Sequence, residues 1–365
     1  MSTIKNKTFN FNAGPAMLPI EVMEKAKEEF LDYQGTGMSV MEMSHRGTHF
    51  HEIIESAESN LRRLLNISEN YSVIFYPGGA TLQFSAVPLN LLNENESGDY
   101  AITGVWTKKA FQEAKKFFPV KSIYDGEIDK YSSTPILHES QISKQAKYVF
   151  ITSNNTIYGT RYKSLPVFKN TPLVADMTSE ILSRKLNIEN FGLIFAGAQK
   201  NIGPSGLTIV IIRNDLLEYK KKEVPILLDY KVMAKNKSLY NTPPTFAIYM
   251  ARLVFDWCIK MGGVEKLEEI NQKKSSILYE YIDSSKLYKA PVQKESRSEM
   301  NVVFHIKEKD LEKSFADESD KNGLHGLSGH RDAGGFRASI YNAMPVEGVL
   351  KLIDFMKDFE DKHVV

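Results

Sequence analysis

The sequence predicts an α/β protein with a second, smaller α+β domain. Short apolar segments of strand length alternate with segments of helical periodicity between residues 72 and 212. After Pro243-Pro244 the pattern changes to long helices with a few alternating segments. A length of 365 residues favours two domains. We expect a large domain at 17–260 and a small C-terminal domain at 261–365, joined by an N-terminal segment at 1–16.

The first elements are an extended segment and two helices. Residues 1–16 are predicted to be extended and to end in the turn Asn12-Ala-Gly-Pro15. A helix is predicted over 19–33, because Pro19 suits a first helical turn and apolar residues recur at helical spacing behind it. The same spacing predicts a helix from His49 to Leu65.

Alternating elements follow and define a mostly parallel sheet. A glycine pair, Gly78-Gly79, separates the first strand from a helix that begins at Thr81 and is interrupted or kinked near Pro88. A second helix is expected from Lys108 to Phe117. The predicted strands are Ser72 to Tyr76, Tyr100 to Val105, Tyr148 to Thr152, Leu173 to Ala175, Gly192 to Ala196 and Leu207 to Ile212.

The C-terminal part reads as helix, helix, strand, strand and helix. The first helix ends at the pair Gly262-Gly263, which is typical of a helix C-terminus. The predicted elements are helices Phe246 to Met261 and Val264 to about Ile282, strands Met300 to Ile306 and Gly335 to Ile340, and a helix Leu350 to Glu360.

Composition excludes several classes of function. The formal net charge of +1 argues against a nucleic-acid surface built on bulk charge. A single cysteine, Cys258, excludes an internal disulfide and a multi-cysteine metal site, so we expect no metal. The apolar runs are far shorter than the roughly 20 residues that span a bilayer. We therefore expect a cytoplasmic protein that binds neither membrane nor nucleic acid.

Lys200 is the most informative residue. It lies between two strand-like apolar runs, just before the turn Gly203-Pro-Ser-Gly206. Alone, such a lysine is more often a surface residue of a loop. In a partly desolvated pocket, however, its pKa falls, and the unprotonated amine can form an imine.

Three further features stand at strand ends. The turn Gly78-Gly79 before a helix can bind phosphate through backbone amides, with Thr81 adding a hydroxyl, although such a turn is often only structural. Asp176 can be a helix cap or can hold a heteroaromatic nitrogen protonated. Trp106 can be a core residue or a stacking surface. Pyridoxal 5′-phosphate (PLP), with its phosphate, ring, ring nitrogen and aldehyde, accounts for all four features.

The chain resembles the phosphoserine aminotransferase family, in the class V branch of fold-type I PLP-dependent enzymes. The resemblance runs from Phe11 to Glu347 and includes long, specific motifs. Examples are Ser39-Val-Met-Glu-Met-Ser-His-Arg-Gly47, Ala196-Gly-Ala-Gln-Lys-Asn-Ile-Gly-Pro-Ser-Gly-Leu-Thr208, Tyr240-Asn-Thr-Pro-Pro-Thr-Phe246 and Gly335-Phe-Arg-Ala-Ser-Ile-Tyr-Asn-Ala-Met-Pro345. The resemblance implies a large domain with a mostly parallel, seven-stranded type of sheet flanked by helices.

The resemblance also implies cofactor roles. Lys200 and Asp176 are the expected catalytic residues: Lys200 forms the imine with the cofactor, and Asp176 pairs with the ring nitrogen. The remaining expected cofactor contacts are Trp106 on the ring, Thr156 at the ring hydroxyl, Ala80, Thr81 and Gln199 at the phosphate, and Asn241 and Thr242 at the phosphate of the neighbouring subunit of a homodimer. Some relatives carry a third glycine and a larger side chain at the positions of Ala80 and Thr81, so a phosphate contact from the Thr81 side chain is left open.

Arginine suits carboxylates and phosphates, and two His-Arg pairs stand in glycine-containing loops. By resemblance, Arg337 holds the substrate α-carboxylate, while His45, Arg46, His330 and Arg331 form an anion pocket. The implied reaction transfers the amino group of L-glutamate to 3-phosphohydroxypyruvate, giving O-phospho-L-serine for serine biosynthesis and 2-oxoglutarate. A second product, 4-phosphohydroxy-L-threonine for vitamin B6 (pyridoxine) synthesis, suits the same pocket.

Four alternatives fit less well. A cysteine desulfurase needs a reactive cysteine on a mobile loop, whereas Cys258 lies in an apolar helical stretch. An alanine–glyoxylate type of aminotransferase does not need the doubled His-Arg pocket. A PLP-binding transcription regulator needs a DNA-binding module, for which no residues are spare. A cofactor-free lysine aldolase leaves the glycine turn and Trp106 unexplained.

Overall fold

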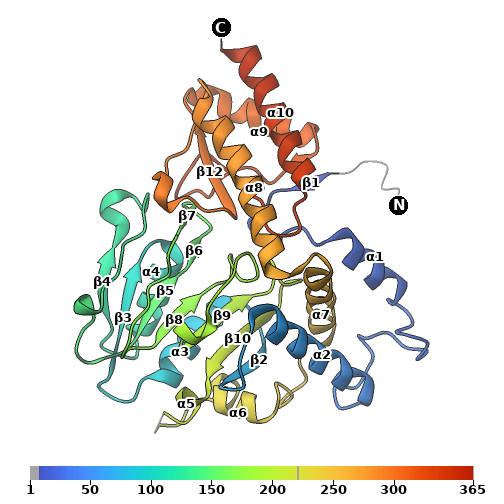
Figure 1. The fold of residues 1–365 in the computed structure, drawn as a ribbon, viewed down its shortest axis with the longest axis vertical. Coiled ribbons are helices and arrows are strands. Elements are labelled where there is room, and N and C mark those ends of the chain that lie inside the picture. The colour runs from blue at the N-terminus through green and yellow to red at the C-terminus, as the bar shows by residue number, and fades with distance from the viewer. Residues whose placement is uncertain (1–7, 220–221, 365) are drawn as a thin grey trace.

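The computed structural model describes residues 8–219 and 222–364, so part of the extended N-terminal segment expected at 1–16 lies outside the described residues. The centre of the large body is a seven-stranded sheet with the order β2-β10-β9-β8-β5-β3-β4, in the lower half of Figure 1. Its strands are β2 (Tyr71–Pro77), β3 (Ser97–Ile102), β4 (Lys121–Asp125), β5 (Ala146–Thr152), β8 (Leu173–Asp176), β9 (Leu193–Gly197) and β10 (Leu207–Arg213).

The expected mostly parallel sheet is confirmed. The ladders β9-β8, β8-β5, β5-β3 and β3-β4 are parallel. Strand β10 runs against its neighbours, pairing antiparallel with both β2 and β9. The β9-β10 reversal is the tight connection that carries Lys200, because Gly197 pairs with Thr208 across it. The carboxyl ends of β5, β8 and β9 therefore meet at one edge of the sheet.

Helices cover both faces of this sheet. Strand residues alternate between two cores: Val73 and Phe75 of β2 face one core, whereas Ile74 and Tyr76 face the other. The first core packs against α1 (Ile20–Glu28), α2 (Thr48–Leu65) and α7 (Thr245–Lys260). The second packs against α3 (Gln83–Leu91), α4 (Val105–Ala114) and α6 (Tyr230–Lys235), and a short helix, α5 (Asn214–Leu217), follows β10.

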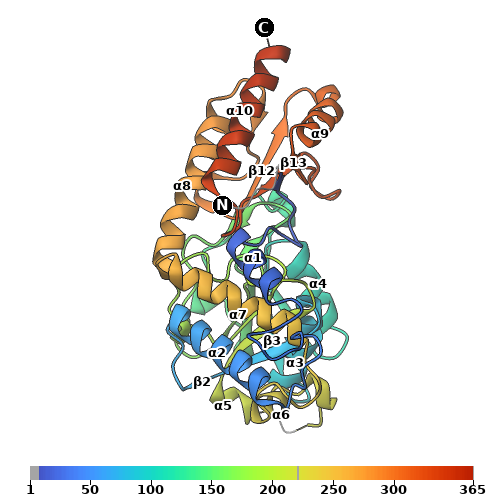
Figure 2. The same ribbon diagram turned by 90° about the vertical axis from the view of Figure 1, so that its right-hand side faces the viewer.

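A smaller body with its own core lies above the large sheet in Figures 1 and 2. Its three-stranded sheet has the order β11-β12-β14, and β1 pairs in parallel with β13. Figure 2 shows α8 and α10 side by side along this body. The elements are β1 (Phe9–Asn10), α8 (Gly263–Ser284), β11 (Tyr288–Lys289), β12 (Asn301–Ile306), α9 (Glu312–Lys321), β13 (Leu324–His325), β14 (Phe336–Ser339) and α10 (Val346–His363).

The helix α8 extends from the large body into the small one, because it contacts α2 and α7 as well as α10 and β12. A division of the chain at residues 260 and 261 stays a prediction. Among the residues that the structure describes, no helix is long and apolar enough to cross a membrane.

Several predicted boundaries were wrong. Strand β3 ends at Ile102 and α4 begins at Val105, so Trp106 lies in a first helical turn rather than at a strand end. Helix α1 ends at Glu28, five residues before the predicted end. The turns that follow the helix include Gln34, Gly35 and Gly37, which have positive φ. The 3₁₀ turn Ala80–Leu82 precedes α3, which continues through Pro88.

Strand β4 and helix α9 are among the elements that the sequence analysis did not predict. Strand β4 lies at the sheet edge and has no buried residue, so its sequence lacks an apolar face. Helix α9 buries only Phe315 and Ser319, which is too narrow a stripe for helical periodicity to reveal.

Candidate active site

A cavity of about 430 Å³ lies at the edge of the sheet where β5, β8 and β9 end, a size typical of small-molecule sites. Its walls come from the large sheet, the N-terminal turn and the small body. The lining residues are Ala13, Gly14, Gly79, Ala80, Thr81, Trp106, Thr152, Asn154, Thr156, Ile157, Asp176, Thr178, Ser179, Gln199, Lys200, His330 and Arg337.

Lys200 enters this cavity from the turn after β9. The turn is closed by hydrogen bonds from the amides of Ile202 and Gly203 to the Ala198 carbonyl, at 3.1 and 2.8 Å. The Lys200 ammonium donates a hydrogen bond of 2.5 Å to the Thr156 hydroxyl. Burial lowers the pKa of Lys200 to about 8, although the neighbouring Asp176 opposes this shift. The amine can therefore lose its proton near neutral pH, as imine formation requires.

Asp176 is the last residue of β8 and is buried. It accepts a hydrogen bond of 3.0 Å from the backbone amide of Thr178, so it also closes the following turn. Burial raises the pKa of the Asp176 carboxyl, while the contacts with Thr178 and the charge of Lys200 oppose the rise. A cationic nitrogen placed beside it would stabilise the charged carboxylate.

Trp106 lines the cavity from the first turn of α4. Its indole Nε1 is buried and has no hydrogen-bond partner among the described residues. A buried indole N–H normally has a partner, so the site has a donor to spare for a bound molecule. Lys109 Nζ lies 4.9 Å from the Trp106 ring centroid.

The glycine turn and Gln199 line the end of the cavity nearest β2. Gly79 has an extended backbone and leads into the 3₁₀ turn Ala80–Leu82. The first amides of a helical turn have no partner within it, which suits an anion. Gln199 lies against Gly197, where a Cβ atom would be only 2.6 Å from Gln199 Oε1. Glycine at position 197 therefore makes room for the Gln199 side chain.

The small body contributes Arg337 and His330. Arg337 lies on β14 and donates a hydrogen bond of 3.4 Å from Nη1 to the Thr156 carbonyl, while its buried Nε has no partner among the described residues. The neighbouring Arg331 does not line the cavity, because its side chain is 91% exposed and lies beside Asp332.

Besides Arg331, four other predicted site residues do not line the cavity of their own chain: His45, Arg46, Asn241 and Thr242. Arg46 and Thr242 are exposed. In contrast, His45 Nε2 and Asn241 Oδ1 are buried without a partner among the described residues. Buried polar groups are normally paired. The described residues of one chain provide no partner for these two atoms.

Sequence reasoning missed other residues of the wall. Thr152 ends β5, and Thr178 and Ser179 follow the end of β8. Their signal was available, since ligands collect at the carboxyl ends of parallel strands. Gly14 packs on the base of the Lys200 turn, where a Cβ atom in its place would lie 3.3 Å from Gln199 Cγ. The contact between Gly14 and Gln199 depends on how the N-terminal turn packs on the site, so the sequence pattern does not predict it.

The chain matches known proteins over nearly its whole length. The family model for class V aminotransferases matches residues 8–352. A phosphoserine aminotransferase of Leptospira biflexa is 57% identical over 361 residues, 99% of each chain.

Two solved structures are similar to this one. A phosphoserine aminotransferase from Bacillus circulans subsp. alkalophilus superposes with a TM-score of 0.95 at 45% identity, covering 98% of this chain and 99% of that one. A PLP-bound phosphoserine aminotransferase from Trichomonas vaginalis superposes with a TM-score of 0.91 at 40% identity, covering 96% and 100%.

Proposed function

The chain belongs to the class V aminotransferase family, and from this membership we propose that it converts 3-phosphohydroxypyruvate and L-glutamate into O-phospho-L-serine and 2-oxoglutarate. It is a PLP-dependent aminotransferase of serine biosynthesis. The observation that carries the proposal is the convergence of Lys200, Asp176 and Trp106 on one cavity of about 430 Å³. When bound, PLP accepts the amino group and delocalises the electrons released at the substrate Cα.

The residues of the cavity fit this cofactor. Lys200 supplies an amine with a pKa of about 8 for the covalent link. Asp176 would hold the ring nitrogen, Trp106 would stack on the ring and Thr156 would bond the ring hydroxyl. The backbone of Ala80 and Thr81, with Gln199, would hold the phosphate. The unpartnered Trp106 Nε1 supports this fit, because a bound anion would give it an acceptor.

Lys200 also has a second role in our proposal. When not bound to the cofactor, its amine would be the base that removes the proton from the substrate Cα. The depressed pKa favours this role, because an amine with a pKa of about 8 is partly unprotonated at neutral pH. Asp176 would supply negative charge beside the protonated ring nitrogen.

The cations around the cavity suit a substrate with two anionic groups. Arg337 would hold the α-carboxylate, since its side chain lines the cavity and its buried Nε has no partner among the described residues. His330, Arg331, His45 and Arg46 would bind the γ-carboxylate of glutamate and the phosphate of the oxo acid in turn. Each hydrogen bond to a charged group contributes about 1.5–3 kcal/mol, so loss of the second anion should cost much affinity.

We further propose a homodimer in the cytoplasm. His45, Arg46, Asn241 and Thr242 do not line the cavity of their own chain, and a second copy would bring such residues to it. The buried, unpartnered His45 Nε2 and Asn241 Oδ1 support an additional covering surface. Sedimentation at micromolar concentration should give a dimer, whereas a monomer with full activity would contradict this part of the proposal.

A transamination panel tests the function directly. Glutamate is paired with 3-phosphohydroxypyruvate, unphosphorylated hydroxypyruvate, glyoxylate and the 2-oxo acid that yields 4-phosphohydroxy-L-threonine. We expect kcat/KM for the phosphorylated acids to exceed that for hydroxypyruvate by about 100-fold or more. Comparable values for hydroxypyruvate and its phosphate would contradict the anion pocket, and preference for glyoxylate would favour the alanine–glyoxylate type of enzyme.

A further inference from the structure

A short hairpin connects the cavity to the small body. Its strands β6 (Asn154–Asn155) and β7 (Thr160–Arg161) pair antiparallel, and Thr156 and Ile157 between them line the cavity. Its far side lies directly on β12: a Cβ atom at Gly159 would lie 2.9 Å from the Asn301 carbonyl, and Gly159 has a φ of +74°. Any shift between hairpin and β12 therefore moves the wall of the cavity.

Asn154 anchors the cavity end of this hairpin. Its Nδ2 donates to Ser179 Oγ and to Asn301 Oδ1, both at 2.8 Å. Its Oδ1 accepts a hydrogen bond of 2.5 Å from Ser298 Oγ. Both amide hydrogens and the amide oxygen are thus used, which fixes the orientation of the buried side chain.

Asn301 continues the chain of hydrogen bonds into the small sheet. It is fully buried, and its Nδ2 donates to Ser339 Oγ at 3.0 Å and to Tyr341 Oη at 3.1 Å. Tyr341 Oη in turn donates to the carbonyl of Ala13, which lines the cavity, at 2.8 Å. Asn301 does not itself line the cavity.

Arg337 depends on the same strand. Asn301 pairs with Ser339 in the β12–β14 ladder, and Ser339 lies two residues after Arg337, on the same face of β14. Arg337 Nη1 donates a hydrogen bond of 3.4 Å to the carbonyl of Thr156. Thr156 lies two residues after Asn154 in the sequence. Two links among the described residues therefore join β14 to the segment 154–156, and the asparagine link does not depend on what Arg337 binds.

We propose that Asn301 is a positioning residue for Arg337: through Ser339 and Asn154 it sets the distance between the guanidinium and the cavity, and thereby the affinity for a carboxylate substrate. This inference rests on the role of Arg337 under the proposed function. A hydrogen bond weakens steeply when its geometry departs from the preferred one, so an amide pair that holds β12 against the hairpin contributes to affinity without touching the substrate.

The test uses the PLP-loaded enzyme and glutarate, a dicarboxylate that lacks the amino group and cannot react. For Asn301→Leu we expect the glutarate Kd, measured by calorimetric titration, to rise about five- to tenfold. The KM for glutamate should rise in parallel, while kcat and the absorbance band of the bound cofactor stay unchanged. An unchanged glutarate Kd would overturn the inference.

Two milder variants serve if Asn301→Leu does not fold. Ser339→Ala and Tyr341→Phe each remove one hydroxyl that accepts from Asn301, and Tyr341→Phe also removes the donor to the Ala13 carbonyl. Each should weaken glutarate binding about two- to fourfold. Wild-type Kd values in both variants would also overturn the inference.

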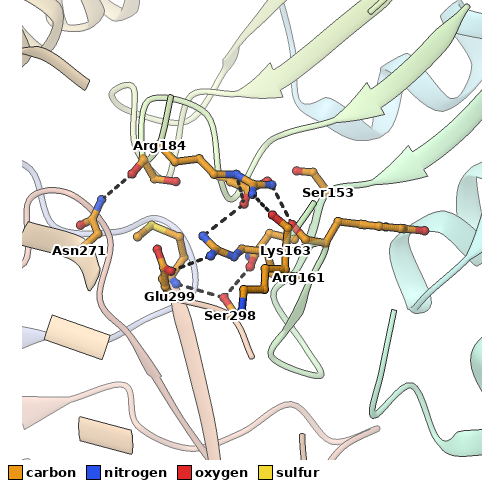
Figure 3. Close-up of polar contacts among 12 residues, drawn as sticks. Ser153, Arg161, Lys163, Arg184, Asn271, Ser298 and Glu299 are labelled. Carbon is orange, nitrogen blue, oxygen red and sulfur yellow. Dashed lines mark hydrogen bonds and ion pairs between the residues drawn. The ribbon is translucent and has the colours of Figure 1, made fainter. Parts of the chain in front are cut away.

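Glu299→Gln is the matched control. Glu299 holds the other end of the same hairpin, where its Oε1 accepts a hydrogen bond of 2.6 Å from Arg161 Nη2, as Figure 3 shows. The contact between Glu299 and Arg161 is made at the end of β7 and involves neither Asn301 nor Ser339. Glutarate affinity should therefore stay within about twofold of wild type. An equal loss in Glu299→Gln and Asn301→Leu would indicate general loosening and overturn a specific role for Asn301.

Arg337→Lys separates this inference from the proposed function. If Arg337→Lys binds glutarate like the wild type, the assignment of Arg337 fails and the inference fails with it. If Arg337→Lys weakens glutarate binding and Asn301→Leu does not, the proposed function stands and only the inference fails.

Discussion

Lys200 donates a hydrogen bond of 2.5 Å to the hydroxyl of Thr156, while the carbonyl of the same threonine accepts from Arg337. Thr156 therefore contacts Lys200 through its hydroxyl oxygen and Arg337 through its carbonyl oxygen. The arrangement directs the lysine amine toward the segment that follows β5. It also holds Arg337 close enough to Lys200 for the charge of Arg337 to help lower the pKa of Lys200.

The first prediction concerns Lys200 itself. Lys200→Ala should abolish transamination and still bind PLP, because the proposed contacts of Asp176, Trp106 and the glycine turn do not depend on the amine. Activity is measured by coupled assay and binding by equilibrium dialysis. Activity of wild-type order in this variant would contradict the assignment, whereas complete loss of PLP binding would show that the covalent link supplies most of the affinity.

The second prediction concerns pH. In cofactor-free protein, the rate of covalent PLP capture should rise with pH through a midpoint of about 8, because only the unprotonated Lys200 amine attacks. Asp176→Asn removes the carboxylate that raises this pKa, so its midpoint should move to lower pH. Stopped-flow absorbance measures both profiles. A midpoint near 10.5, the ordinary value for lysine, would contradict the desolvated environment.

The third prediction concerns Asp176 as the partner of the ring nitrogen. Asp176→Asn should lower kcat by about 100-fold or more, because loss of a preorganised charge opposite developing charge has effects of this size. Single-turnover kinetics with glutamate isolates the chemical step. A kcat within a few-fold of wild type would leave Asp176 only its structural role, the hydrogen bond with the Thr178 amide.

The fourth prediction concerns the buried ion cluster in Figure 3. Glu180 has no exposed surface in its side chain and lies 3.0 Å from Arg184 and 3.8 Å from Arg161. Glu180→Ala should lower the free energy of unfolding by about 3–5 kcal/mol, because the buried Arg184 guanidinium loses its carboxylate and Arg161 keeps only Glu299. Urea denaturation measures the loss.

A matched control for Glu180 is Glu127→Ala. Glu127 is 64% exposed and pairs with Lys108 at 2.8 Å. Exposed pairs contribute little, so the free energy of unfolding should change by less than about 1 kcal/mol. Equal losses in the two variants would contradict the importance of burial in the Glu180 cluster.

The sequence predicted the parts of the fold and site that depend on local patterns. The buried strands β5, β8, β9 and β10 are apolar runs bounded by turns, and each lies within a few residues of its predicted bounds. The positions of Lys200 and Asp176 at strand ends follow from the same runs. Parallel strands bring such ends together, so their common cavity could be predicted without coordinates.

Long-range contacts could not be predicted in this way. Asn154 and Asn301 are 147 positions apart, and neither stands in a pattern that shows its partner. The exposed strand β4 lacks an apolar face. The apolar run before Trp106 predicts a strand end there, whereas the structure begins α4 directly after Gly104, whose missing side chain leaves room for Asn155.

The central claim is that Lys200 carries the cofactor. The most direct measurement is borohydride reduction of the PLP-loaded protein, followed by proteolysis and mass spectrometry of the peptides. We predict one phosphopyridoxyl group per chain, on Lys200. A stoichiometric label on any other lysine, such as Lys109 beside Trp106, with Lys200 unmodified, would contradict the account.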